Sequence, residues 1–186
     1  FLPDSSYGWL NSGSKLKYPA VFENHRRVKL SGEAFFVVQK KVNSDFTVNA
    51  PEMDIKVVGT SFNISAYSDD AFTDIVLMEG KVEITGKGGV FNQMLLPDEK
   101  LSYNRETKSM TVQKVSAGRY SAWKDGYLII ENEPLELAIS RIERRYNVDI
   151  IIRDAALKKY RFKATFKDEP LEEVLRLMAI TTPMTY

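Results

Sequence analysis

The sequence predicts two folded parts, an all-β domain over residues 1–118 and a small α+β domain over residues 119–186. Up to about residue 115, apolar residues recur at alternate positions in short runs separated by Gly, Asn, Asp and Pro, which is typical of β-strands. Farther on, they recur every three or four positions, which is typical of an amphipathic helix. The chain has 186 residues, 44% of them hydrophobic, and is long enough to bury a core.

Several stretches of the first part carry the alternating pattern. In the first of them, Val28 and Leu30 share one side, and the alternation continues through Phe35 and Val37. Because none of these stretches has a convincing helical period, we expect a sandwich, a jelly roll or a solenoid-like β-domain. The stretches, in order, are RRVKLSGEAFFVVQ (26–39), FTVNA (46–50), DIKVVGTSFNISAY (54–67), DIVLMEGKVEIT (74–85), MLLPDEKLSY (94–103) and SMTVQKV (109–115).

The second part contains two similar helical segments after a linker-like stretch at 116–120. Pro134 suits the first turn of the first helix, where its missing N–H needs no partner. The Glu-Pro-Leu-Glu start at Glu133 recurs at Glu169, and strand-like segments flank each helix. We therefore expect two β-α-β units, the second of which lacks its C-terminal end at Tyr186. The apolar face of the first helix consists of Leu135, Ala138, Ile139, Ile142 and Tyr146.

Composition narrows the classes of partner. Lys and Arg number 26 against 25 Asp and Glu, so a net charge of +1 gives no general reason to expect nucleic acid or an anionic membrane surface. No apolar run approaches the roughly 20 residues that span a bilayer, and any targeting or anchoring segment is expected outside the given residues. The absence of cysteine excludes disulfides and thiolate metal sites.

Residues 57–67, VVGTSFNISAY, place hydroxyl side chains beside Gly59, as many hydrolases do. A nucleophilic Ser61 would depend on His25, the single histidine, and the Gly-x-Ser-x-Gly elbow is missing. One histidine is also too few for a histidine-based metal site. We therefore interpret Gly59 as a strand bend after which Phe62 returns to the core, and we predict no catalytic, cofactor or metal site.

Blocks spread over most of the chain resemble one protein family. The sequence WKDGYLIIENEPLELAISRIERRYNVDI (123–150) is similar to the C-terminal domain of FecR-type regulators, which itself resembles the short signalling (STN) domain of certain TonB-dependent outer-membrane transporters. Ser5 and Asp98 depart from the family pattern, and we expect only local changes of turn there. Five blocks resemble, in order and spacing, the periplasmic FecR-type domain common among Bacteroidetes: LPDSSYGWLNSGSKLKYP (2–19), RRVKLSGEAFFVV (26–38), DFTV (45–48), VVGTSFNISAY (57–67) and VLMEGKVEI (76–84).

The resemblance implies the periplasmic part of an inner-membrane anti-sigma regulator that is not an enzyme. It implies that the C-terminal region contacts the signalling domain of a TonB-dependent transporter, which leads to release of an extracytoplasmic-function sigma factor, with regulated proteolysis as an intermediate. The family's sigma-factor-binding cytoplasmic segment and its transmembrane helix would precede Phe1, so the chain itself is expected to bind neither sigma factor nor membrane.

Two other functions remain open from the residues alone. One is a carbohydrate- or cell-wall-binding β-domain without catalysis, in which exposed aromatic side chains stack on sugar rings. The other is an enzyme, which would need a pocket where carboxylates converge. The aromatic candidates for sugar binding are Tyr7, Trp9, Tyr18 and Tyr67.

Two surfaces of the α+β domain are candidates for the partner site. In RFKATF (161–166) the apolar residues alternate with Arg161, Lys163 and Thr165, which predicts one buried face and one basic face. The segment is either an edge strand that can add to another chain or an internal strand paired on both sides. The strand YLIIE (127–131) offers a similar edge. The competing surface lies on the first helix and consists of Glu136, Ser140, Glu143 and Arg144.

Overall fold

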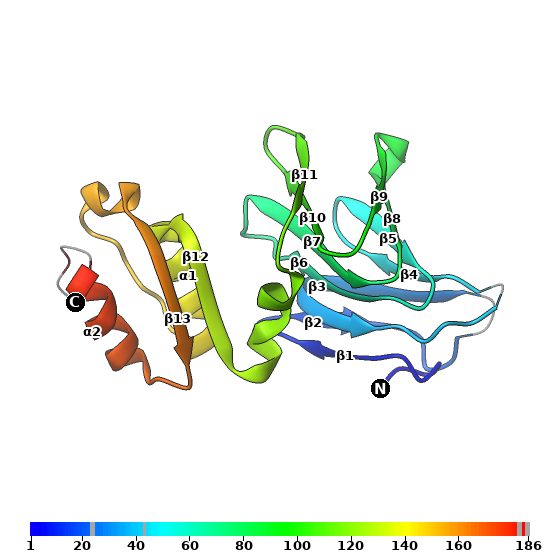
Figure 1. The fold of residues 1–186 in the computed structure, drawn as a ribbon, viewed down its shortest axis with the longest axis horizontal. Helices are drawn as coiled ribbons and strands as arrows, with labels where there is room; N and C mark the ends of the chain where they lie inside the picture. Colours follow the sequence, from blue (N-terminus) through cyan, green and yellow to red (C-terminus); the bar gives the residue numbers. More distant parts are fainter. Residues whose placement is uncertain (23–24, 43, 182–183, 185–186) are drawn as a thin grey trace. The chain divides into compact units, whose positions relative to one another are not determined.

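The chain divides into two compact units, Phe1–Lys124 and Asp125–Tyr186, here called the β unit and the C-terminal unit (Figure 1). The computed structural model describes residues 1–22, 25–42, 44–181 and 184. The predicted fold class, an all-β domain followed by a small α+β domain, is confirmed. The stretch at 116–120 that was expected to be a linker lies mostly within a 3-10 helix, η2 (Ala117–Asp125), in which Ala117 and Ser121 are buried.

In the described part of the β unit, eleven strands join into one continuous sheet. The long strand β3 divides it into two halves, called here the first and the second sheet. The first sheet runs β1-β3-β6-β7-β10-β11, and the second runs β2-β3-β4-β5-β8-β9. All neighbours are antiparallel except β3 and β4. The strands are β1 (Tyr7–Leu10), β2 (Lys15–Lys17), β3 (Arg26–Val37), β4 (Phe46–Asn49), β5 (Met53–Val57), β6 (Ser61–Ala66), β7 (Phe72–Glu79), β8 (Val82–Gly86), β9 (Asn92–Leu95), β10 (Glu99–Asn104) and β11 (Met110–Lys114), with a short 3-10 helix η1 (Lys87–Gly89) between β8 and β9.

The shared strand β3 passes from one sheet to the other at Gly32. Up to Ser31 it pairs with β2 and β4, and from Gly32 onward it pairs with β6 and β1. Gly32 has a φ of +102°, and a Cβ there would lie 2.5 Å from Ser14 Oγ and 2.7 Å from Ser14 Cα. The strand therefore needs a glycine at this position, both for its backbone conformation and for the close approach of Ser14.

The core of the β unit lies between the two sheets. Inward side chains alternate with outward ones in strands such as β4 and β8. In β3 the predicted continuation of the core side through Phe35 and Val37 is wrong, because Ala34 and Phe36 are the residues that join Val28 and Leu30 in the core. Phe36 of β3 and Phe62 of β6 stack with ring centroids 5.5 Å apart, and both are almost fully buried. Burial of a side chain of this size contributes about 1.5–3 kcal/mol, so these alternating positions supply most of the driving force for folding.

Among the described residues, the C-terminal unit is a two-stranded sheet covered on one face by two helices (Figure 1). Its core combines Leu128, Ile130, Phe162 and Phe166 of the strands with apolar residues of both helices. The strands pair antiparallel, with an irregularity between Ile130 and Glu133. The elements are β12 (Tyr127–Pro134), α1 (Leu135–Tyr146), a 3-10 helix η3 (Ala155–Lys159), β13 (Arg161–Lys167) and α2 (Leu171–Thr181).

The segment 148–152 was expected to be a strand but pairs with none in the part of the chain that the structure describes. Asn147 ends α1 in the left-handed conformation, with a φ of +53°, and Val148 N–H bonds to Glu143 O. Ile150 and Ile152 then pack against the core while Ile151 is exposed. The alternating pattern therefore reflects side chains that pack on one side of an extended segment whose backbone is not hydrogen-bonded to another strand. The strand expected at the C-terminal end falls mainly on residues outside those described.

Among the described residues, no helix is long and apolar enough to cross a membrane.

Candidate partner-binding surface

The face of the β12–β13 sheet that points away from the helices carries exposed polar side chains and two half-buried ones, Tyr127 and Ile129. Lys163 Nζ lies 3.3 Å from Glu131 Oε2, and the Lys163 side chain is 71% exposed. Lys167 Nζ donates to the Tyr127 hydroxyl at 3.1 Å, and this hydrogen bond raises the pKa of Lys167. Thr165, which is exposed, lies opposite Ile129. The face thus offers the half-buried Ile129 between Lys163 and Lys167, the Tyr127 ring opposite Lys167, and the Glu131 carboxylate beside Lys163.

The alternation predicted for 161–166 is observed. Phe162 and Phe166 are buried, whereas Arg161, Lys163 and Thr165 are exposed. Across the described ranges, β13 has β12 as its only strand partner. Arg161 bonds to Asn132 at the irregularity of β12, which fixes this end of the sheet.

The competing residues on α1 make contacts within the unit. Glu136 pairs with Lys158 of η3 at 2.8 Å, and Ser140 Oγ donates to the Glu136 carbonyl at 3.2 Å. Glu143 Oε1 accepts the Ile150 N–H at 2.7 Å, which holds the segment after the helix in place. Arg144 is half-buried. The two predicted sets therefore lie on different elements, β13 and α1, and the structure does not merge them into one site.

The stretch 57–67 is a structural bend. Gly59 has a φ of +65°, and Thr60, which is buried, donates its hydroxyl to Lys81 O at 3.1 Å. In the part of the chain that the structure covers, no hydrogen bond joins Ser61 to His25, which is exposed. Asn63 is buried and bonds to Glu33 Oε1 at 2.8 Å. The polar residues of this stretch therefore satisfy neighbouring groups of the sheet.

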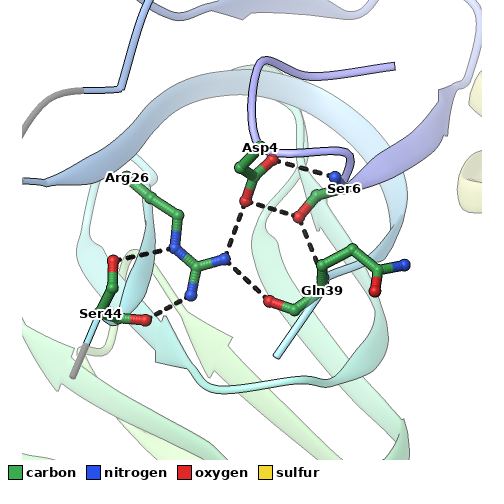
Figure 2. Close-up of polar contacts among 5 residues, drawn as sticks. All are labelled: Asp4, Ser6, Arg26, Gln39 and Ser44. Carbon is green, nitrogen blue, oxygen red and sulfur yellow. Dashed lines mark hydrogen bonds and ion pairs between the residues drawn. The ribbon is translucent and has the colours of Figure 1, made fainter. Parts of the chain in front are cut away.

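A buried ion pair in the β unit was missed by the sequence analysis (Figure 2). Arg26 Nη1 lies 2.8 Å from Asp4 Oδ2, and the two side chains are 3% and 1% exposed. The guanidinium also donates to the Gln39 carbonyl at 2.8 Å, to Ser44 Oγ at 3.2 Å and to the Ser44 carbonyl. Ser6 donates its N–H and its hydroxyl to Asp4 at 3.0 and 2.7 Å. Together these bonds fasten residues 4–6 to the start of β3.

The electrostatics of Asp4 follow from these contacts. Burial alone raises the pKa of its carboxyl, but the hydrogen bonds from Arg26 and Ser6 outweigh it and hold the pKa below the usual range. The alternation in β3 could have predicted this pair, because Arg26 lies on the inward side of the strand with Val28 and Leu30. An arginine at an inward position needs an acidic or carbonyl partner.

The structure also bears on the aromatic residues considered for sugar binding and on a possible metal site. Tyr67, one of the aromatic candidates for sugar stacking, is only 7% exposed and donates its hydroxyl to Ser12 O at 2.8 Å, so its place in that set is wrong. Trp9 and Tyr18 are exposed. Within the described ranges there is no group of three or more His, Cys, Asp or Glu side chains that could hold a metal ion.

Comparisons with known proteins agree with one another. The family profile described as FecR protein matches residues 1–83, and the profile described as FecR, C-terminal matches residues 127–186. Two crystal structures of a proposed anti-sigma factor from Parabacteroides distasonis are similar to this chain over its full length. The first has 30% identity and a TM-score of 0.93, and the alignment covers 100% of this chain and 87% of the other. The second has 30% identity and a TM-score of 0.91, with coverage of 100% and 86%. A comparison with curated protein sequences gives no match.

Proposed function

Because the chain belongs to the FecR protein family, we propose that it is the periplasmic portion of an inner-membrane anti-sigma regulator. It relays a signal from a TonB-dependent outer-membrane transporter to an extracytoplasmic-function sigma factor by protein contact. The observation that supports this most is the match of all 186 residues, at 30% identity, to a proposed anti-sigma factor. We assign sigma-factor binding and membrane attachment to parts of the regulator other than residues 1–186.

The transporter's signalling domain binds, in this proposal, to the β12–β13 sheet of the C-terminal unit. Three features support that surface: the helices pack on one face of the sheet and not on the other, β12 and β13 each pair with a single strand among the described residues, and β13 carries Arg161, Lys163 and Lys167 on its exposed positions. An open edge offers unpaired N–H and C=O groups for strand addition, and the positive charges steer an acidic partner toward it. Residues of both surfaces make contacts within the unit, Lys163 with Glu131 and Glu136 with Lys158, so these contacts alone do not decide between β13 and α1.

Charge-neutral variants distinguish the two surfaces. Lys163→Gln removes a positive charge from β13 without placing a second carboxylate beside Glu131. Arg144→Gln removes a positive charge from α1. Lys114→Gln is the matched control, because Lys114 is an exposed lysine on an edge strand, β11, of the β unit. Association rates with the transporter's signalling domain are measured for each variant by surface plasmon resonance at low and at physiological salt.

We expect Lys163→Gln to slow association about two- to fivefold at low salt, with a smaller effect at high salt, since an exposed charge acts mainly on the association rate. Lys114→Gln should leave the rate unchanged. If Arg144→Gln slows association while Lys163→Gln does not, the helix surface is the partner site and the assignment to β13 is wrong.

A further inference from the structure

The 3-10 helix η2 joins the β unit to the following residues, and its last turn lies against the first sheet. Trp123 Nε1 donates to Asn63 Oδ1 of β6 at 3.0 Å. Lys124 Nζ lies 5.5 Å from the ring centroid of Trp9 in β1 and 5.8 Å from that of Phe35 in β3. Both distances suit a cation–π interaction. This turn therefore contacts three neighbouring strands, among them the N-terminal strand.

The contacts fall on one row of residues that crosses the sheet. Each member lies opposite the next in the strand register, and Lys100, at the β10 end, has its Nζ 5.0 Å from the ring centroid of Tyr120 in η2. The helix thus follows the row from β10 to β1. The outer row, as we call it, consists of Trp9, Phe35, Asn63, Val76 and Lys100.

Burial within the outer row supports this docking. Ala34 and Phe36 belong to the core between the sheets, so Phe35 points to the opposite face. The same argument applies to Val76, whose neighbours Ile75 and Leu77 belong to that core. Phe35 and Val76 are nevertheless only 5% and 1% exposed. Tyr120, Trp123 and Lys124 of η2 contact this face, so we attribute part of the burial of the outer row to the helix.

A chain of hydrogen bonds runs from the N-terminal strand to the helix beside this row. Asn11, the residue after β1, donates from Nδ2 to Glu33 Oε2 at 2.7 Å, and Asn63 Nδ2 donates to Glu33 Oε1 at 2.8 Å. The other side of the Asn63 amide accepts the Trp123 indole N–H. A carboxylate only accepts and an indole only donates, so the residue between them must do both, which an amide can do.

We propose that β1 and η2 form a clasp, in which the N-terminal strand supplies part of the seat that keeps the connecting helix docked. The Trp9 ring contacts Lys124 of η2. The hydrogen bonds from Asn11 through Glu33 and Asn63 hold the Trp123 indole in place. Loosening β1 therefore undocks η2, and undocking η2 loosens β1, since the coupling between two sites is reciprocal. A force or a binding event at the chain that precedes β1 is passed to the chain that leaves the β unit at residue 125. The clasp lies within the chain and does not depend on the identity of a partner.

Hydrogen exchange of the whole chain, read by mass spectrometry, tests the clasp. Trp9→Ala removes the ring that Lys124 contacts. Because Trp9 is 41% exposed, the fold tolerates the change. We expect exchange of the backbone amides in 117–124 to speed up about three- to tenfold, while amides of β5 and β8 in the second sheet stay unchanged. Tyr18→Ala is the matched control, because Tyr18 is an equally exposed aromatic residue of the β unit at 45%.

The reciprocal variant is Trp123→Phe, which keeps the aromatic ring and removes the indole donor. It should speed exchange at residues 7–11, at the far end of the hydrogen-bond chain, by a similar factor. Asn63→Asp should do the same from the middle of the chain, because a carboxylate there faces that of Glu33. The clasp is refuted if Trp9→Ala leaves 117–124 unchanged, or if every peptide of the β unit accelerates equally, since the effect would then be a general loss of stability.

Discussion

Replacing Asp4 with alanine tests whether the buried ion pair holds the N-terminal segment on the β unit. The change leaves the Arg26 guanidinium, 3% exposed, without its carboxylate. Breaking a buried pair by removing one partner costs about 3–5 kcal/mol. Arg26 keeps the Gln39 carbonyl, Ser44 Oγ and the Ser44 carbonyl as acceptors. We therefore expect a loss at the lower end, about 3 kcal/mol of the free energy of unfolding.

Urea unfolding followed by tryptophan fluorescence measures this loss. The chain has two tryptophans, Trp9 and Trp123, and both lie in the β unit, so their emission reports on that unit alone. Asp4→Asn is the matched variant, because its amide oxygen still accepts from Arg26 although the charge is gone; about half the loss is expected. If Asp4→Ala costs less than about 1 kcal/mol, Arg26 finds water or other acceptors and the pair does not hold the segment.

Acid adds a second test of the same pair. The pKa of Asp4 is lower in the folded chain than the ordinary value of about 3.9, so its contribution is complete above that value and is lost as the pH falls through the folded pKa. The urea midpoint of the wild-type β unit should therefore drop below about pH 4, and this drop should be smaller in Asp4→Asn. An equal drop in both would assign the acid sensitivity to other carboxylates.

Substitutions at three further positions have expected outcomes. Gly32→Ala should lower the stability of the β unit by about 2 kcal/mol or more, because φ is positive and Ser14 occupies the space of the new Cβ; an unchanged urea midpoint would contradict this. Ile142→Ala, at a fully buried site on α1, should destabilise the C-terminal unit by about 2–5 kcal/mol in hydrogen exchange while the tryptophan transition stays in place; a shift of that transition would mean that the two units unfold together. Asn147→Ala should cost about 1 kcal/mol in the same unit because the left-handed cap disfavours a Cβ, whereas Asn147→Gly should be neutral or stabilising in thermal melts.

The sequence predicted those features that depend on local periodicity. Alternation gave the strands of the β unit, and the spacing of Leu135, Ile139 and Ile142 gave the buried face of α1. The segment 148–152 has the same alternation and is not a strand, because periodicity records which side chains are buried and not whether the backbone finds a partner. Hydrogen bonding of the backbone to Glu143 substitutes for a ladder there.

Long-range contacts were the part that the sequence could not supply. Asp4 and Arg26 are far apart along the chain, and only the fold brings them together. The docking of η2 was missed for a related reason: residues 116–120 have the composition of a linker, while Trp123, which anchors the helix, finds Asn63 sixty positions earlier. For the partner surface, the alternation in 161–166 predicted which side chains are exposed, but the internal contacts of Glu136 and Glu143 became visible only in the structure.

Isothermal titration calorimetry of this chain with the periplasmic signalling domain of its cognate transporter tests the proposed relay most directly. Direct contact predicts one-to-one binding with a dissociation constant of about 1 μM or tighter, and a measurable heat at concentrations well above it. Lys114→Gln should leave this affinity unchanged, and Lys163→Gln should weaken it at low salt. No heat at concentrations of about 100 μM, at two temperatures so that a vanishing enthalpy is not mistaken for absent binding, would contradict the relay by protein contact.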